Sequence, residues 1–355
     1  MSGPKVLVTG AGGFIGGWMA EALHLMGWDV RAGVGRWSSA ARIGRFPFEI
    51  VHCDVTQGAS LDAALSGVEV VIHCARGKID DVVVEGSVTL GGTRLLLERA
   101  RAAGVRHVVH LSSAAVYGET LGVVHEDTPV AGELSVYGQG KRAAELACEQ
   151  LADDRMRVSV IRPTLVYGPF SEQWSTPYIT RFRSGRWRKL GARGEGKANL
   201  VYVGDLVHQA VFLIENDLGP FVLVNGNGPD TPTWNEYLEG FNAALGNAPL
   251  AEPAEAALGL QVALRRPVRI LGKYLLANHR ELLMFAARNA PPLKRAMKAA
   301  EADLKLNPND DEMKRFGEDV VYSMDRSRAL GFTPRTSTAD GLALTADWAR
   351  FIGLA

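Results

Sequence analysis

Near its start the chain reads Val6-Leu7-Val8-Thr9-Gly10-Ala11-Gly12-Gly13-Phe14-Ile15-Gly16, an apolar run followed by a glycine-rich turn. The turn opens a helix-like stretch from Phe14 to Met26. Glycine lets the backbone bend sharply and approach a pyrophosphate, and the unpaired N–H groups at the start of a helix attract negative charge. The strand before the turn and the helix after it, more than the glycine spacing, predict a dinucleotide-binding site.

Short apolar runs alternate with longer helical patterns over the first part of the chain. We expect strands at 5–9, 29–34, 49–53, 68–74, 105–112 and 158–162, and crossover helices at 14–26, 61–65, 82–103 and 136–151. This alternation is typical of βαβ units, which build a buried parallel sheet covered by helices on both faces. The sequence therefore predicts an α/β Rossmann fold, a doubly wound parallel sheet with a smaller C-terminal substrate lobe.

The length of 355 residues suggests two domains. We place a dinucleotide-binding Rossmann domain at 1–169 and a largely helical substrate-binding lobe at 170–355. Segments near 200–225 are expected to return to the first domain. The basic stretch 264–305 is expected to form a helix that faces solvent or a second subunit, with contact to an anionic substrate or a membrane surface as the alternatives.

The composition argues against several classes of function. Basic and acidic residues number 39 each, so no net charge favours nucleic acid or a membrane as a partner. Three cysteines fit a reducing compartment, and neither a signal peptide nor an apolar run of about 18 residues is recognisable. The histidines lack metal-ligand spacing, so we expect no metal. These features predict a soluble cytoplasmic protein that acts on a small molecule.

A second motif, Tyr137-Gly138-Gln139-Gly140-Lys141, begins a helical run. Residues four apart share one helix face, so the Lys141 ammonium can stabilise the Tyr137 phenolate and lower a pKa that starts at about 10. Such a phenol can exchange a proton with a substrate oxygen while hydride moves to or from a nicotinamide. Ser113, at the end of the fifth expected strand, could orient that oxygen. A surface Tyr–Lys pair and a turn serine are the structural alternatives.

Together these motifs resemble the extended short-chain dehydrogenase/reductase family of NAD(P)-dependent epimerases, dehydratases and ketoreductases. The resemblance covers most of the chain and includes His73-x-Ala75, Arg162-Pro163, Tyr167-Gly168-Pro169 and Val203-x-Asp205. It implies a catalytic triad of Ser113, Tyr137 and Lys141.

The resemblance also implies which residues touch the ligands. The expected cofactor contacts are Gly10, Gly13, Phe14, Ile15, Gly16, Arg36, Ser38, Asp54, Val55, Ala75, Tyr137, Lys141 and Pro163. The expected substrate contacts are Arg76, Ser113, Tyr167 and Asn199. We further expect a homodimer that does not bind nucleic acid or a membrane.

Two departures from the family pattern narrow the chemistry. Ala114-Ala115 stands where the family's dehydratases carry an Asp-Glu pair, so we do not expect dehydration. The second strand lacks the acidic residue that would bind the adenosine ribose of NAD. Instead Arg36 follows, one residue later than in the reductases it resembles, and favours NADP(H), with NAD(H) as the alternative.

A third departure concerns the substrate. Sugar epimerases of the family commonly carry an arginine that grips the nucleotide diphosphate where this chain has Ala198-Asn199, although five arginines between 181 and 193 could replace it. We expect an NAD(P)-dependent oxidoreductase or epimerase acting on a nucleotide-sugar or related polyhydroxylated substrate. The alternatives are an NADP(H)-dependent ketoreductase, similar to dihydroflavonol reductases or hydroxysteroid dehydrogenases, and a non-catalytic dinucleotide sensor.

Overall fold

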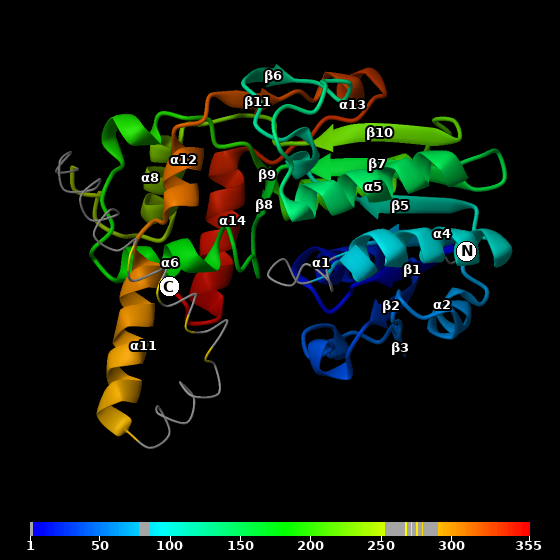
Figure 1. Cartoon of the computed structure of the whole chain (residues 1–355), viewed down its shortest axis with the longest axis horizontal. Coiled ribbons are helices and arrows are strands. Elements are labelled where there is room, and N and C mark those ends of the chain that lie inside the picture. The colour runs from blue at the N-terminus through cyan, green and yellow to red at the C-terminus, as the bar shows by residue number, and fades with distance from the viewer. Residues whose placement is uncertain are drawn as a thin grey trace. The chain divides into compact units, whose positions relative to one another are not determined.

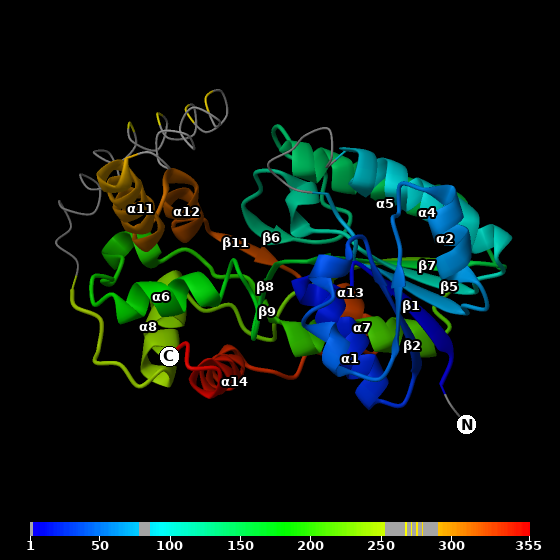
Figure 2. The ribbon, with the colours of Figure 1, turned by 90° about the horizontal axis from the view of Figure 1, so that it is seen from below.

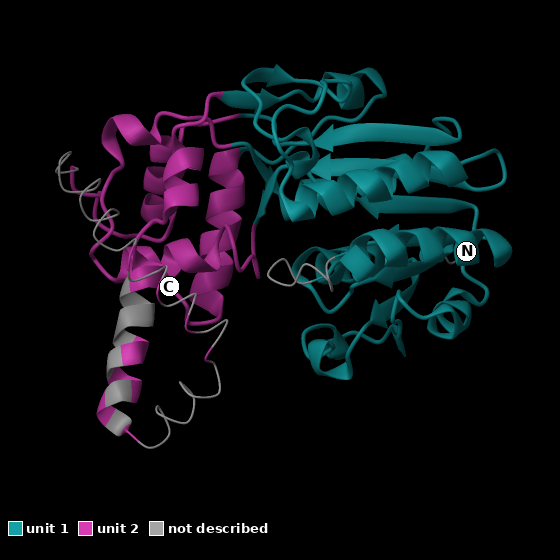
Figure 3. Cartoon of the chain, in the orientation of Figure 1, with its two compact units in different colours: residues 1–167, 199–230, 320–337 teal, residues 168–198, 231–319, 338–355 magenta. Residues whose placement is uncertain are grey.

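The computed structural model describes residues 3–77, 86–252 and 290–355, together with the single positions 267, 271, 275 and 279. The chain divides into two compact units, each built from separate segments of the sequence (Figure 3). Unit 1 comprises Met1–Tyr167, Asn199–Asp230 and Val320–Ser337, and unit 2 comprises Gly168–Ala198, Thr231–Asp319 and Thr338–Ala355. The sequence did not suggest that residues 320–337 belong with the first unit.

A seven-stranded parallel sheet forms the centre of unit 1, in the order β10-β7-β5-β4-β1-β2-β3 (Figure 1). Its strands are β1 (Lys5–Thr9), β2 (Asp29–Val34), β3 (Glu49–His52), β4 (Val70–His73), β5 (His107–Leu111), β7 (Arg157–Pro163) and β10 (Phe221–Gly226). Strand order reverses at β1, which pairs with both β2 and β4. The predicted doubly wound Rossmann sheet is confirmed, and ligands of such sheets bind beyond the carboxyl ends of the strands at the point of reversal.

Helices cover both faces of this sheet (Figure 2). One face carries α1 (Phe14–Leu25) and α7 (Val203–Glu215), and the other carries α2 (Gly58–Leu65), α4 (Gly92–Ala102) and α5 (Val136–Leu151). A π-helical turn, η3 (Gly86–Gly91), leads into α4, and the start of the helix expected at 82–103 lies outside the described residues. Apolar side chains of β1, β4, β5 and β7 pack under α2, α4 and α5 to form the main core.

Short elements complete unit 1. Strand β6 (Gly122–Val124) pairs with β11 (Val320–Tyr322), and β8 (Leu165–Tyr167) pairs with β9 (Leu200–Tyr202), both in parallel. The 3₁₀ turns η1 (Trp37–Ser39), η2 (Ile43–Arg45) and η4 (Ala114–Tyr117) and the helix α13 (Asp325–Ala329) lie in loops. Three-residue strands are too short to show a period of two, so the sequence did not predict β6, β8 or β11.

Unit 2 is built from helices: α6 (Thr176–Arg183), α8 (Trp234–Ala244), α11 (Pro291–Leu306), α12 (Asp310–Phe316) and α14 (Thr338–Phe351), with the turn η5 (Gly191–Gly194). Capping boxes begin α8, at Thr233 and Glu236, and α12, at Asn309 and Glu312. Within the basic stretch 264–305, the continuously described part belongs to α11. None of the described helices is long and apolar enough to cross a membrane.

Candidate active site

The glycine-rich turn lies at the carboxyl end of β1, where strand order reverses. Gly10 has a positive φ of 68°, and a Cβ there would lie 2.8 Å from the Ala75 nitrogen after β4. A Cβ on Gly16 would clash with the carbonyl oxygen of Gly10. Only glycine fits both positions, because the turn folds tightly on itself and on the next strand.

Helix α1 starts directly from this turn. Gly13 is its N-cap residue and supplies no capping side chain. The first N–H groups of a helix have no intrahelical partner, so those of Phe14 and Ile15 are suited to bind an anion. The turn and the helix start therefore fit the pyrophosphate of a dinucleotide, and the cofactor contacts expected of this pair and of Gly10, Gly13 and Gly16 stay predictions.

The loop after β2 carries the residues expected near the adenosine. Arg36 and Ser38 are exposed, and the Arg36 side chain makes no hydrogen bond or ion pair within the described part of the chain. A Cβ on Gly35 would have its nearest neighbour 4.0 Å away, so space remains beside this arginine. Arg42, further along the loop, is held by Glu21 through a 2.8 Å contact of Nε with Oε1.

Residues after β3 line the next part of this edge. Both carboxylate oxygens of Asp54 accept local hydrogen bonds, one from the Thr56 nitrogen at 3.0 Å and one from Gln57 Nε2 at 2.7 Å. Val55 is buried, and its side chain reaches Gly92 at the start of α4. These contacts give Asp54 and Val55 a role in folding the loop, beside the expected contact with the cofactor.

Residues after β4 and β7 continue the same edge. The Ala75 nitrogen donates to Thr9 Oγ1 at 3.4 Å, which links the ends of β4 and β1. Arg76 is exposed, and its Nη1 donates to the carbonyl of Gly77 at 3.4 Å. Pro163 is buried as the last residue of β7. All three lie at carboxyl ends of strands, where a cofactor would pass.

The loop after β5 and helix α5 bring the expected triad together. Ser113 is the N-cap of η4, and its Oγ accepts from the Ala115 nitrogen at 3.2 Å, which leaves its own proton available to donate. Lys141 is 3% exposed, and its Nζ donates to the carbonyl of Leu111, the last residue of β5, at 2.7 Å. The lysine of α5 is therefore fastened to the strand that precedes the serine.

Tyr137 lies half-buried in the first turn of α5. Ser135 caps this helix by accepting from the Gly138 nitrogen at 3.1 Å. A Cβ on Gly138 would lie 2.6 Å from the carbonyl oxygen of Ala115, so the first turn of α5 presses against the loop that carries Ser113. The glycine inside the Tyr-x-x-x-Lys motif is required by this close packing.

The sequence did not predict a buried ion pair that lies close to the expected triad. Glu145 is 1% exposed and Arg162 is 3% exposed, and they form two hydrogen bonds of 2.8 and 2.7 Å. Ser112 Oγ also donates to Glu145 Oε1 at 2.6 Å. The pair joins α5, one turn after Lys141, to β7, and Ser112 ties it to the end of β5. The signal in the sequence was one charged residue, Glu145 or Arg162, within each of two segments whose other residues are expected to be buried.

Two of the expected substrate contacts are used inside unit 1. Asn199 is 4% exposed: its Nδ2 donates to the Val320 carbonyl at 2.7 Å and its Oδ1 accepts from the Tyr322 nitrogen at 3.1 Å. Tyr167 is 1% exposed and packs edge-on against Tyr202, with ring centroids 5.7 Å apart. The contacts of Asn199 and Tyr167 give no support to a substrate role, because both side chains hold β8, β9 and β11 in place.

The arginines between 181 and 193 are also partly engaged. Arg181 is 5% exposed and makes hydrogen bonds of 2.7 and 3.0 Å to the two carboxylate oxygens of Glu312. Arg183 and Arg188 donate to backbone carbonyls of unit 2. Of the five arginines that could bind a diphosphate, these three already have partners within unit 2.

Comparison with known proteins agrees with this arrangement. The model of the NAD dependent epimerase/dehydratase family matches residues 6–223. The chain belongs to this family. The resemblance inferred from its motifs is therefore confirmed, and the protein is an NAD(P)-dependent enzyme of the epimerase or dehydrogenase type.

Among the family's curated members, UDP-glucose 4-epimerase of Mycolicibacterium smegmatis is 32% identical over 57% of this chain and 71% of that protein. Cinnamoyl-CoA reductase 1 of Oryza sativa subsp. japonica is 31% identical over 51% of this chain and 59% of its own length. Ceramide reductase of Caulobacter vibrioides is 28% identical, over 69% and 71% respectively. Epimerases and reductases thus match at similar levels.

Solved structures share the whole fold. MoeE5 in complex with UDP-glucose and NAD aligns with a TM-score of 0.69 at 22% identity, over 98% of this chain and 99% of that one. UDP-glucuronic acid 4-epimerase from Bacillus cereus, in complex with NAD, aligns with a TM-score of 0.71 at 18% identity, with the same coverage. At these identities the likeness concerns the fold of the epimerase/dehydratase family.

Proposed function

We propose that the protein transfers hydride between a nicotinamide cofactor and a secondary alcohol or ketone of a nucleotide-sugar or related polyhydroxylated substrate, with Tyr137 as the acid and base. The placement of Ser113, Tyr137 and Lys141 carries this proposal. Ser113 follows the carboxyl end of β5, and Lys141 of α5 binds the last carbonyl of that strand, at the same end of the parallel sheet as the glycine-rich turn after β1. A dinucleotide sensor would not need this triad.

Each side chain of the triad has one task. A bound nicotinamide would supply the hydride donor or acceptor. Tyr137 takes the proton of the substrate alcohol in oxidation and returns it to the carbonyl oxygen in reduction. Lys141, held by the Leu111 carbonyl, places a positive charge that stabilises the phenolate form of Tyr137. Ser113 is free to donate its proton to the substrate oxygen, because its own oxygen is already held by the Ala115 nitrogen.

A second candidate function is supported by the contacts of Asn199 and Arg181. Both side chains are buried and bonded within their own units, so neither is available to grip a nucleotide diphosphate. This favours the alternative of an NADP(H)-dependent ketoreductase of a non-nucleotide carbonyl compound. Two of the relatives, cinnamoyl-CoA reductase and ceramide reductase, are named as reductases. The homodimer and the cytoplasmic location stay predictions.

The two candidates differ in whether cofactor is consumed. Purified protein is expected to interconvert a UDP-sugar with no net change in the absorbance of reduced nicotinamide. Such a sugar should also raise the unfolding temperature, because a ligand at 100 times its Kd stabilises the folded state by about 2.7 kcal/mol. The same assay with NADPH and a panel of aryl and long-chain ketones is the comparison. Steady loss of NADPH, with no shift from any sugar, would replace the first candidate by the second.

We propose NADP(H) as the preferred cofactor and NAD(H) as accepted. Arg36 is exposed, unbonded within the described residues and next to the open space at Gly35, whereas Arg42 is held by Glu21. Arg36→Ser is expected to weaken NADP(H) binding by about 10- to 100-fold, the value of a hydrogen bond to a charged group. NAD(H) binding should stay within a few-fold, because it lacks the 2′-phosphate.

Titration of both cofactors against Arg36→Ser measures this preference. Arg42→Ser is the matched control, since it removes an arginine of the same loop and should change stability rather than cofactor choice. Equal losses for NAD(H) and NADP(H), or no loss for either, would assign cofactor choice to other residues.

A further inference from the structure

Three polar side chains form a row across the interior of the sheet. Thr9 of β1 is in register with His73 of β4, and His73 is in register with His110 of β5. All three have no exposed surface. They lie on the face covered by α4 and α5, because His73 Nε2 contacts Thr93 Oγ1 of α4 at 3.0 Å. A buried polar row of this kind needs partners for every donor and acceptor.

His73 is fully bonded, and its contacts decide its tautomer. Thr93 Oγ1 donates to the carbonyl of Thr89 at 2.5 Å, so it accepts from the ring and the proton of His73 lies on Nε2. His73 Nδ1 then accepts from Thr9 Oγ1 at 2.7 Å. Burial, and next the charge of Lys141, lower the pKa of His73 to about 3. The ring is therefore neutral at any pH in which the enzyme would work.

His110 differs because neither ring nitrogen has a hydrogen-bond partner among the described residues. Its ring centroid lies 5.3 Å from that of His73. Burial holds the pKa of His110 well below its usual range, and Lys141 and His73 are the charged and titratable groups that act on it. A neutral imidazole still has one N–H and one lone pair to satisfy, and leaving them unbonded is costly.

Of the proposed triad, Lys141 is the residue that a hydrogen bond connects to the strand segment of His110. Its Nζ binds the carbonyl of Leu111, which directly follows His110 on β5. An ammonium carries three donors, and buried waters commonly join polar groups that have no direct partner. The unbonded imidazole of His110 and the charged group of Lys141 are thus linked through two consecutive residues of β5.

We propose that His110 is a positioning residue for Lys141: its neutral ring accepts, through one buried water, a hydrogen bond from the ammonium group. This inference rests on the proposed roles of Tyr137 and Lys141. The water and the ring hold the Lys141 ammonium in one position, and its fixed positive charge stabilises the phenolate of Tyr137. Protonation of His110 would put a second positive charge there, and burial prevents it.

The pH profile of the oxidation reaction tests this proposal. The oxidation rate falls at low pH because the Tyr137 phenolate takes up a proton. A Lys141 that is held less well stabilises the phenolate less, so the acidic limb of the pH profile moves to higher pH. His110→Phe is expected to raise the acidic limb of kcat/KM by about half to one pH unit, a part of the value of one hydrogen bond to a charged group, because His110 acts on Tyr137 only through Lys141. His110→Gln, whose amide can accept the same bond, should return the limb to its wild-type position.

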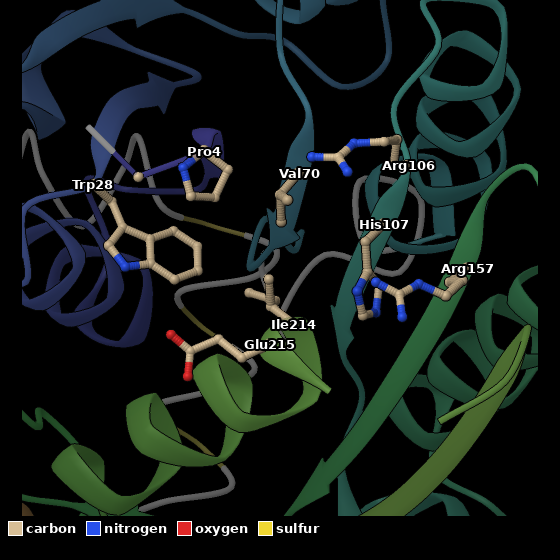
Figure 4. A pocket seen from close by; sticks show the side chains of 9 residues that line it. Pro4, Trp28, Val70, Arg106, His107, Arg157, Ile214 and Glu215 are labelled. Carbon is tan, nitrogen blue, oxygen red and sulfur yellow. The ribbon is translucent and has the colours of Figure 1, made fainter. Parts of the chain in front are cut away.

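His107 offers a matched control on the same strand. It is 2% exposed, its Nδ1 also lacks a partner among the described residues, and its Nε2 contacts Ser159 at 2.9 Å. It lines a cavity of about 290 Å³ with Arg106, Arg157 and Trp28, where β5 and β7 begin (Figure 4). Burial, and then Arg157, lower its pKa to about 4, with no influence from Lys141. His107→Phe should therefore leave the pH limb unchanged; an equal shift in both variants, or none in His110→Phe, overturns the proposal.

A second measurement needs no turnover, so it separates this inference from the proposed function. Protein labelled with ¹⁵N-histidine is expected to show His110 as a neutral ring with one nitrogen shifted by a hydrogen bond. Lys141→Met, which removes the charge and keeps a chain of similar length, should abolish that shift and leave His107 unaffected. An unchanged His110 signal in Lys141→Met overturns the proposal, even if His110→Phe cannot be purified in a folded form.

Discussion

Replacing Tyr137 by phenylalanine is expected to lower turnover by about 100- to 10,000-fold and to change cofactor affinity by no more than a few-fold. The substitution removes one hydroxyl and keeps the ring in the first turn of α5. Lys141 keeps its hydrogen bond to the Leu111 carbonyl, and the glycine-rich turn is untouched. Steady-state rates measure the first effect, and titration of the cofactor measures the second.

Tyr237→Phe is the control for the loss of a hydroxyl. Tyr237 OH donates to the carbonyl of Trp174 at 2.6 Å within unit 2, so its removal should lower stability by about 1 kcal/mol with little effect on turnover. Undiminished turnover in Tyr137→Phe would remove the proposed mechanism. A parallel loss of cofactor affinity would instead make this tyrosine part of the cofactor site.

Glu145→Ala is expected to lower the free energy of unfolding by about 3–5 kcal/mol, the cost of breaking a buried ion pair. The substitution leaves Arg162 buried without its carboxylate. Burial alone would lower the pKa of Arg162, but the hydrogen bonds and charge of Glu145 raise it above its usual value. Unfolding by denaturant, followed by fluorescence, measures the loss. Activity should fall as well, because Glu145 connects α5 to β7 through Arg162 and to the end of β5 through Ser112, next to Ser113.

A double variant separates the two effects. Glu145→Leu with Arg162→Met replaces both charges by apolar groups and should recover most of the stability, since such replacements are often neutral or stabilising. Arg94→Ala is the surface control: its 3.2 Å pair with Glu98 is exposed, and its loss should cost less than about 0.5 kcal/mol. A loss of the same small size in Glu145→Ala would show that the buried pair carries little of the stability.

Much of the fold could be predicted because it depends on local patterns. The expected strands 5–9 and 29–34 have the bounds of β1 and β2, and the expected helix 136–151 has those of α5. Apolar runs that alternate with helical patterns lead to a parallel sheet, and right-handed crossovers leave few ways to order its strands. The carboxyl ends of those strands meet at one edge, so Ser113 was expected to lie near the glycine-rich turn.

The sequence could not show the partners of polar side chains when those partners lie far away along the chain. Asn199 looked available for a substrate, but its amide is bonded to residues of β11, more than a hundred positions later. Arg181 looked like a candidate phosphate ligand and is instead bonded to Glu312. The type of a polar residue indicates which groups it can bind. The neighbouring sequence does not indicate which of those groups the fold brings into contact with it.

The sequence by itself determined the family and the doubly wound sheet, and it predicted the pyrophosphate turn and the Tyr137–Lys141 pair, because each depends on residues within one element or one turn. Only the tertiary structure decided that residues 320–337 join unit 1, that Glu145 and Arg162 are paired, and that His110 lies next to His73 with no hydrogen-bond partner among the described residues. The physical reason is that burial and hydrogen bonding are set by packing between elements that are distant along the chain. Composition and spacing contain no record of those contacts.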